Sequence, residues 1–173
     1  MQRIALLGST GSIGTNALDV ISMFPDKFNV SLLSTHSNIG LLLKQIDKFR
    51  PKAVSVVDIE KAREIREKLK KKKIKLYEGE TGLCNMLEDI SVDTLIVGIV
   101  GASALLPILT AVSKVKKIAL ANKEALVMAG DIIMKKIKKN NVEILPVDSE
   151  HSAIFQCIGT EKKDIKKIYL TGS

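Results

Sequence analysis

The sequence predicts an α/β protein built on a doubly wound, Rossmann-like parallel sheet with helices on both faces. Short apolar segments alternate with longer amphipathic ones, which is the pattern of repeated strand–helix units. The short segments are apolar at successive positions, as strands are when both faces of their sheet are covered. A glycine-rich segment follows the first apolar run, where such folds place a ligand-binding turn. Right-handed crossovers between these units produce the double winding.

Each element follows from the same patterns, because short apolar runs predict strands and a spacing of about 3.6 residues predicts helices. We expect strands at residues 4–7, 30–33, 53–57, 75–77, 94–97, 118–120, 142–145 and 168–170. We expect helices at residues 12–23, 39–49, 59–72, 82–87, 102–112, 125–138 and 152–158. Pro25 ends the first helix, and Pro107 kinks or delays the one that contains it.

The composition indicates a substantial aliphatic core and a positive surface. Of the 173 residues 46% are hydrophobic and only 3% aromatic, so Ile, Leu, Val and Ala must form the core. A net charge of +8 suggests a nucleic-acid partner, but base stacking needs exposed aromatic side chains. The charge also lies in lysine-rich stretches typical of solvated helix faces, at residues 70–73, 114–117, 135–139 and 162–163. We therefore expect attraction of anionic ligands and no nucleic-acid partner.

Membrane and zinc sites are not expected. No window approaches ~18 uncharged apolar residues, and the first apolar run is too short for a signal peptide, so we expect no membrane partner and a cytoplasmic location. Cys84 and Cys157 have no metal-ligating neighbour at short spacing. Both are expected to be buried apolar residues.

The glycine segment Gly8–Gly14 has the spacing G-x-x-G-x-x-G between a strand and a helix. Gly8 would allow a tight turn, Gly11 would let the backbone approach a pyrophosphate, and Gly14 would let the helix pack closely. The free N–H groups at the start of the helix favour phosphate, and Thr10 and Ser12 add hydroxyl groups. We interpret the segment as a dinucleotide site, with a purely structural turn as the alternative.

The end of the second strand favours NADP over NAD. An NAD site usually has an acidic residue there, bound to the ribose hydroxyls, whereas residues 34–38 read Ser-Thr-His-Ser-Asn. Hydroxyl and amide donors can bind a 2′-phosphate that an acid would repel. His36 would add charge, or it is an ordinary loop histidine.

Two further motifs follow strands, so we expect all of them to meet at one edge of the sheet. Asp148 and Glu150 flank Ser149 and suit a hard cation such as Mg²⁺ or Mn²⁺, although two carboxylates leave the metal short of ligands. The alternative is that Asp148 or Ser149 only caps a helix. In the motif Ala121–Glu124, a lysine can pair with an anionic substrate, or an Asn cap simply starts a helix.

Together these motifs resemble the 1-deoxy-D-xylulose 5-phosphate reductoisomerase family. The resemblance rests on the segments Gly8–Gly14, Gly98–Gly101, Leu120–Glu124, Leu145–His151 and Leu170–Ser173. It implies an NADPH- and metal-dependent enzyme of the non-mevalonate isoprenoid pathway. Such an enzyme rearranges deoxyxylulose phosphate and reduces the resulting aldehyde to 2-C-methyl-D-erythritol 4-phosphate.

The resemblance also implies roles for individual residues. NADPH would be bound by Thr10, Gly11, Ser12, Ile13, Asn38, Asn122 and Glu124. The sugar phosphate would contact Lys123, Ser149 and Glu150, and Mg²⁺ or Mn²⁺ would be bound by Asp148 and Glu150. Lys123, Asp148 and Glu150 would thus be the catalytic residues. Many members have Gly and a basic residue in place of His36-Ser37, which weakens the inferred 2′-phosphate contacts.

The expected organisation is an NADPH-binding domain at residues 1–147 and the start of a catalytic domain at residues 148–173. Members of the family normally continue further, with a third metal carboxylate, a phosphate site, a lid and a helical domain, and they tend to form homodimers. We therefore expect this chain to bind NADPH, bind metal weakly and turn over negligibly. The alternatives are a non-catalytic dinucleotide-binding module, a semialdehyde or homoserine dehydrogenase, and a basic nucleic-acid binder.

Overall fold

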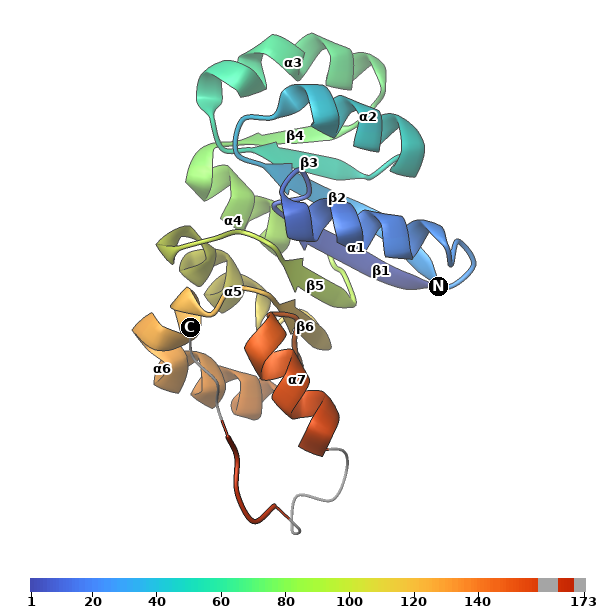
Figure 1. Cartoon of the computed structure of the whole chain (residues 1–173). Helices are drawn as coiled ribbons and strands as arrows, with labels where there is room; N and C mark the ends of the chain where they lie inside the picture. Colours follow the sequence, from blue (N-terminus) through green and yellow to red (C-terminus); the bar gives the residue numbers. More distant parts are fainter. Residues whose placement is uncertain (159–164, 170–173) are drawn as a thin grey trace.

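The computed structural model describes residues 1–158 and 165–169, and its centre is a seven-stranded sheet (Figure 1). Every pair of neighbouring strands is parallel, and the strand order is β4-β3-β2-β1-β5-β6-β7. The strands are β1 (Gln2–Leu7), β2 (Phe28–Thr35), β3 (Ala53–Val56), β4 (Lys75–Glu78), β5 (Thr94–Val97), β6 (Lys117–Leu120) and β7 (Glu143–Pro146). The order reverses between β1 and β5, which confirms the doubly wound, Rossmann-like fold.

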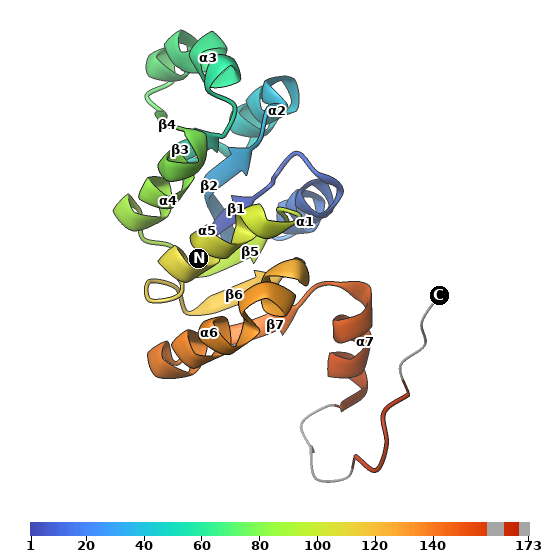
Figure 2. The same ribbon diagram turned by 90° about the vertical axis from the view of Figure 1, so that its left-hand side faces the viewer.

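Helices cover both faces of the sheet (Figure 2). The helices are α1 (Ser12–Ser22), α2 (Ile39–Phe49), α3 (Ile59–Lys71), α4 (Gly79–Asp89), α5 (Leu105–Ala111), α6 (Glu124–Asn140) and α7 (Ser149–Ile158), with a 3₁₀ turn η1 (Ala102–Ala104) before α5. Helices α1, α2 and α3 pack on one face, and α4, α5 and α6 pack on the other. Because α4 connects β4 to β5 across the sheet, it produces the reversal of strand order.

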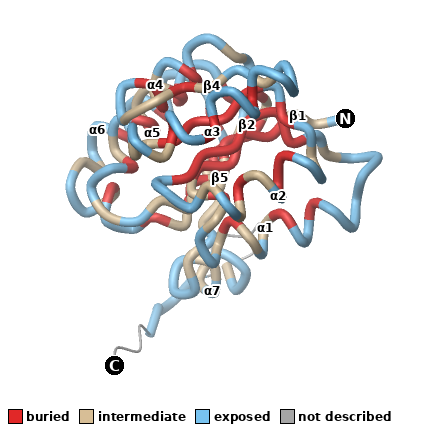
Figure 3. The backbone as a smooth tube through the Cα atoms, turned by 90° about the horizontal axis from the view of Figure 1, so that it is seen from above, coloured by how far each residue is buried: buried red, intermediate tan, exposed pale blue. Residues whose placement is uncertain are grey.

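The core consists of two aliphatic layers, one on each side of the sheet. On β1, Ile4 and Leu6 face the layer under α1 and α2, whereas Ala5 and Leu7 face the layer under α4 and α5. All four residues are buried. Figure 3 shows β1 and β2 mostly as buried chain, with exposed segments on the surrounding helices. Burial of successive residues explains why the strands read as continuous apolar runs. Each fully buried Leu or Ile stabilises the fold by about 1.5–3 kcal/mol.

Several expectations about individual elements were wrong. Ile168 and Tyr169, expected in a final strand, lie in irregular chain with exposed side chains, and Leu170 lies outside the described residues. An apolar triplet becomes a strand only where a sheet edge accepts its backbone hydrogen bonds. Cys157, expected to be buried, is exposed on α7, which has no buried residues. Helix α6 contains a break at Ala129 (φ −147°, ψ 30°) that the sequence did not predict.

Pro107 lies in the first turn of α5, which begins at Leu105 after the η1 turn. A proline in the first turn needs no hydrogen-bond acceptor for its nitrogen, so it delays the α-helix without kinking it. Helix α7 begins at Ser149, earlier than expected, because Asp148 caps it: its Oδ1 accepts from His151 N–H at 3.0 Å.

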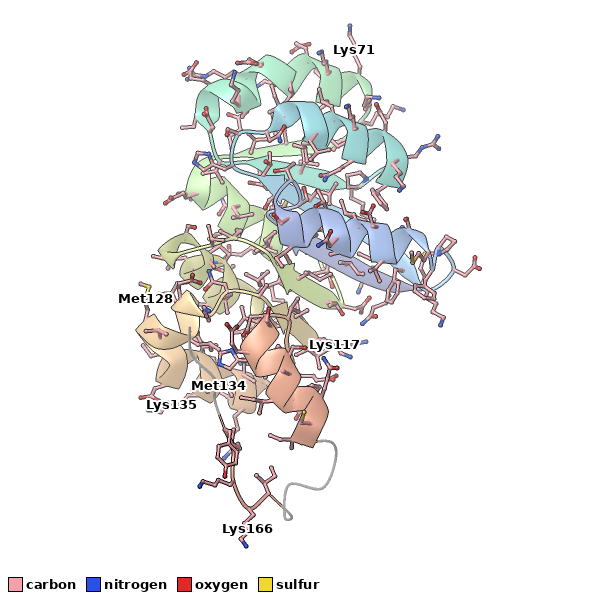
Figure 4. The ribbon with its side chains drawn as sticks, viewed as in Figure 1. Lys71, Lys117, Met128, Met134, Lys135 and Lys166 are labelled. Atoms are coloured by element: carbon pink, nitrogen blue, oxygen red, sulfur yellow. The ribbon has the colours of Figure 1, made fainter. Side chains whose placement is uncertain are left out.

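The lysines point in several directions. Lys71, Lys117, Lys135 and Lys166 lie on different sides of the molecule (Figure 4). Others form surface ion pairs, such as Lys61 with Glu64 and Lys75 with Asp89. The expectation of no nucleic-acid partner remains a prediction. Within residues 1–158 and 165–169, no helix has the length and apolar character needed to cross a membrane.

Candidate functional site

The carboxyl ends of the parallel strands gather the predicted motifs at one edge of the sheet. The loops after β1 and β5 meet at the point where the strand order reverses. The loops that follow β2, β6 and β7 lie at the same edge because all these strands run in one direction. Ligands of doubly wound folds bind in the crevice at such a reversal. The convergence expected from the sequence is therefore present.

The backbone of the glycine loop requires glycine at two positions. Gly8 has φ +75°, and a Cβ added there would lie 2.8 Å from the carbonyl oxygen of Gly98. A Cβ added at Gly14 would lie 2.3 Å from the Gly8 carbonyl oxygen. Real Cβ atoms do not approach backbone so closely, so Gly8 supports the tight turn and Gly14 the close packing of α1, as predicted.

Gly11 lies at the open side of the same loop. A Cβ added there would meet only the Gly8 carbonyl oxygen, at an ordinary 3.5 Å, so a side chain could be accommodated at this position. Gly11 is the N-cap residue of α1 and supplies no side-chain cap. In the described part of the chain, the N–H groups of Ser12, Ile13 and Gly14 have no acceptor. This arrangement suits an anion at the positive end of the helix.

Several polar residues that hold the loop were not predicted from the sequence. Gly8 N–H donates to the Ser34 hydroxyl at 3.1 Å, and Ser9 N–H donates to the Ser34 carbonyl at 2.7 Å. The Thr10 and Thr35 hydroxyls lie 2.6 Å apart. Gln45 of α2 makes two further hydrogen bonds to Ser9. The short polar residues near the end of β2 were a possible signal, since a strand buried on both faces is otherwise apolar.

The loop after β2 presents polar side chains at its surface. His36 and Ser37 are exposed, and Asn38 caps α2 by accepting from Leu41 N–H at 3.1 Å. Asp58, on the neighbouring loop after β3, donates its N–H to the His36 carbonyl, while its carboxylate caps α3. The carboxylate typical of an NAD site is therefore absent from the end of β2 itself.

Asn122 is used within the protein. It is 2% exposed, its Nδ2 donates to the carbonyls of Ile99 and Gly101, and its Oδ1 accepts from Ala125 N–H. The side-chain amide therefore has no donor left for a ligand, and it braces the loop after β5 while it caps the start of α6. This matches the alternative interpretation as a helix cap. Its expected contact with NADPH stays a prediction that only its backbone could satisfy.

The acidic motif lies after β7. The Oδ2 atom of Asp148 is 2.8 Å from Nδ1 of His151. Burial raises the pKa of Asp148, but the hydrogen bonds from the backbone and ring of His151 outweigh it, so the pKa is below its ordinary value. Glu150 lies 3.8 Å from the Lys123 ammonium, and both side chains are exposed, as are Ser149 and Glu124. This ion pair brings the motifs after β6 and β7 together.

The donor set for a metal is incomplete. Asp148 and Glu150 offer carboxylate oxygens, the ligands that Mg²⁺ and Mn²⁺ prefer. Among the residues that the structure describes, no group of three or more His, Cys, Asp or Glu side chains is placed to hold a metal ion. The two carboxylates can therefore serve as part of a site that needs further oxygen ligands.

Comparison with known proteins gives a consistent result. The 1-deoxy-D-xylulose 5-phosphate reductoisomerase family model matches residues 4–130, and the model of that enzyme's C-terminal domain matches residues 144–173. The chain is 46% identical to the reductoisomerase of Thermoanaerobacter pseudethanolicus over 174 residues and 47% identical to that of Thermodesulfovibrio yellowstonii. Each of these two matches covers 100% of this chain and 45% of the relative.

Solved structures of reductoisomerases also match this chain. A DOX-P reductoisomerase in complex with NADPH, fosmidomycin and magnesium is 37% identical with a TM-score of 0.86, over 92% of this chain and 40% of that one. The Zymomonas mobilis enzyme in complex with NADPH is 32% identical with a TM-score of 0.87, over 94% of this chain and 43% of that one. The chain thus spans less than half the length of its relatives, and its sequence and fold place it in the 1-deoxy-D-xylulose 5-phosphate reductoisomerase family.

Proposed function

We propose that this chain is the NADPH-binding part of an enzyme that converts 1-deoxy-D-xylulose 5-phosphate to 2-C-methyl-D-erythritol 4-phosphate. The observation that carries the proposal is the glycine loop at the reversal of strand order, with its unpaired amides and its open side at Gly11. Membership of the reductoisomerase family supports 1-deoxy-D-xylulose 5-phosphate as the substrate, and two related structures are described as complexes with NADPH. The reaction serves the non-mevalonate isoprenoid pathway.

The loop residues would bind the pyrophosphate of NADPH. Thr10, Gly11, Ser12 and Ile13 surround the start of α1, where exposed amides offset phosphate charge. Asn38 lies in the loop after β2, where the adenosine ribose would lie, and Asn122 and Glu124 lie beyond β6, where the nicotinamide would lie. The small polar groups after β2 favour a 2′-phosphate over a bare ribose.

The residues beyond β6 and β7 would bind the substrate and a metal. Lys123 would neutralise an anionic oxygen of the sugar phosphate, and Ser149 would donate a hydrogen bond to the substrate. Asp148 and Glu150 would hold Mg²⁺ or Mn²⁺, which when bound polarises the substrate carbonyl as a Lewis acid. His151 holds Asp148 ionised and oriented, and the Lys123–Glu150 pair keeps both groups at the edge of the sheet.

The domain boundary and the activity of this chain belong to the same proposal. We assign residues 1–147 to the NADPH-binding domain and residues 148–173 to the start of the catalytic domain, because β7 completes the sheet and α7 buries no residue. With two metal carboxylates among the residues that the structure describes, NADPH binding would be retained, metal binding weak and turnover negligible. A homodimer of the longer protein and a cytoplasmic location remain predictions.

Titration of the 173-residue chain with NADPH and NADH, with and without Mn²⁺, tests the proposal. We expect NADPH to bind at least about tenfold more tightly than NADH, the factor that corresponds to one charge-assisted hydrogen bond. Tighter binding of NADH would contradict the choice of cofactor. Turnover at the rate of the longer relatives would contradict the assignment of an incomplete active site.

A further inference from the structure

A buried glutamine of helix α2, Gln45, makes hydrogen bonds to the glycine loop on the side that faces the helix. Gln45 is only 6% exposed and lies on the inner face of α2, next to the aliphatic residues Leu42 and Ile46. Its Nε2 donates to the Ser9 carbonyl at 2.7 Å, and its Oε1 accepts from the Ser9 hydroxyl at 2.7 Å. A buried amide at such a position is costly unless it is fully paired, and both ends of this amide are paired.

The hydrogen bond to the Ser9 carbonyl has a consequence for the next residue. A peptide bond is planar and trans, so the Ser9 C=O and the Thr10 N–H point in opposite directions. With the carbonyl held toward α2, the Thr10 N–H must point away from α2. In the described chain this N–H has no acceptor, although the Thr10 hydroxyl is itself held by Thr35 at 2.6 Å. The free donor therefore has a defined direction.

We propose that Gln45 is a positioning residue for dinucleotide binding: it orients the Ser9–Thr10 peptide so that the Thr10 N–H faces the pyrophosphate. Gln45 itself touches no ligand, because Ser9 is fully buried and separates it from the open side of the loop. The inference rests on the proposed binding of NADPH at this loop. Helices α1 and α2 pack on the same face of the sheet (Figure 1), so the glutamine reaches the loop without bridging solvent.

Gln45→Met tests this role, since methionine keeps a similar volume and removes both hydrogen bonds. We expect NADPH to bind the folded variant at least about tenfold more weakly, the loss typical of one misdirected donor to a charged group. Binding of 2′-AMP, which has no pyrophosphate, should change by less than about twofold. The contrast between the two ligands distinguishes a positioning role from a merely stabilising one, because a general loss of stability would weaken both.

Two further variants separate positioning from stability. Ile46→Val removes a methylene from the adjacent buried residue and should leave NADPH affinity unchanged within about twofold. Ser9→Ala keeps the Nε2 bond to the carbonyl, so it should weaken binding less than Gln45→Met does, and it serves if the methionine variant does not fold. Wild-type affinity in folded Gln45→Met, or an equal loss in Ile46→Val, would overturn the positioning role alone. Failure of the wild-type chain to bind NADPH would instead overturn the proposed function.

Discussion

The glycine loop and the acidic motif lie at the same edge of the sheet but are held in different ways. The loop after β1 is tied to β2, β5 and α2 by backbone contacts and by buried hydrogen bonds that span 36 residues. The Asp148–His151 motif is held by a helix cap within four residues and by one exposed ion pair at 3.8 Å. The cofactor half of the site is therefore held by buried contacts between distant segments, whereas the metal half is held by one helix cap and one exposed ion pair.

Gly14→Ala should produce the largest effect, because Gly14 packs directly against the backbone of the glycine loop. The new Cβ would lie 2.3 Å from the Gly8 carbonyl and must displace either the loop or α1. We expect the free energy of unfolding to fall by about 3 kcal/mol, at the upper end for overpacking. Urea unfolding monitored by circular dichroism measures this change. Gly130→Ala is the matched control, since nothing lies within 4 Å of a Cβ there.

Gly11→Asp should abolish NADPH binding and leave the fold intact. The position is open, so the side chain fits, but it puts a negative charge where the pyrophosphate should lie. We expect NADPH affinity to fall at least about a hundredfold, with a stability change within ~1 kcal/mol. Isothermal titration calorimetry measures the affinity, and Gly11→Ala separates bulk from charge. Unchanged affinity in the aspartate variant would remove the glycine loop from the site.

Asn122→Leu tests the brace between the loops after β5 and β6. The change leaves the carbonyls of Ile99 and Gly101 and the N–H of Ala125 without partners. We expect a loss of about 2–3 kcal/mol of unfolding free energy, the cost of buried unsatisfied groups. Chemical denaturation measures it. Asn38→Ala, which removes an exposed helix cap, is the control and should lose only about 1 kcal/mol.

Acid should loosen the pairing of β1 with β5 through Asp93. This carboxylate accepts hydrogen bonds from the side chain and backbone of Arg3, which hold the pKa of Asp93 far below its ordinary value. Since the folded state lowers the pKa, the stabilisation is complete above the unfolded-state pKa of about 4 and is lost as the pH falls below it. Because Asp93 is partly exposed, we expect its charge to contribute about 1 kcal/mol to the free energy of unfolding.

The measurement is the free energy of unfolding of the wild type and of Asp93→Asn between pH 7 and pH 2. The two proteins should differ at neutral pH and converge as the pH falls. A difference that persists unchanged at pH 2 would show that Asp93 acts through packing and not through its charge.

Asp148→Asn should have the smallest effect on stability, because the hydrogen bonds of Asp148 lie within the first turn of α7. We expect the cap of α7 to weaken by about 1 kcal/mol or less, without effect on unfolding of the sheet. Mn²⁺ binding, followed by electron paramagnetic resonance, should weaken further from an already low affinity, while NADPH binding stays unchanged. A loss of NADPH affinity in this variant would contradict the separation of the two halves.

Much of the fold was predictable because it depends on local patterns. The expected helix at residues 39–49 and strand at residues 94–97 match α2 and β5 at both ends. The strand expected at residues 168–170 has a similar apolar pattern, but its two described residues, Ile168 and Tyr169, lie in no strand. Hydrophobic pattern alone does not reveal whether a sheet edge is available.

The candidate site also has features that the sequence predicted and features that only the structure revealed. The glycine spacing and the acidic motif were visible in the sequence, since each occupies a few consecutive residues. The use of Asn122 as an internal brace was open until its three partners were known, and the role of Gln45 was not visible. A glutamine within an amphipathic helix looks the same whether it faces water or a loop.

By itself, the sequence determined the order of strands and helices, the family and the residues at the strand ends, because these follow from periodicity and short motifs. Only the tertiary structure decided which backbone groups remain free to bind a ligand. That depends on contacts between segments far apart in the chain, such as Ser9 with Gln45 and Gly8 with Gly98. Those contacts arise when the loop after β1 packs against the loop after β5 and against helix α2.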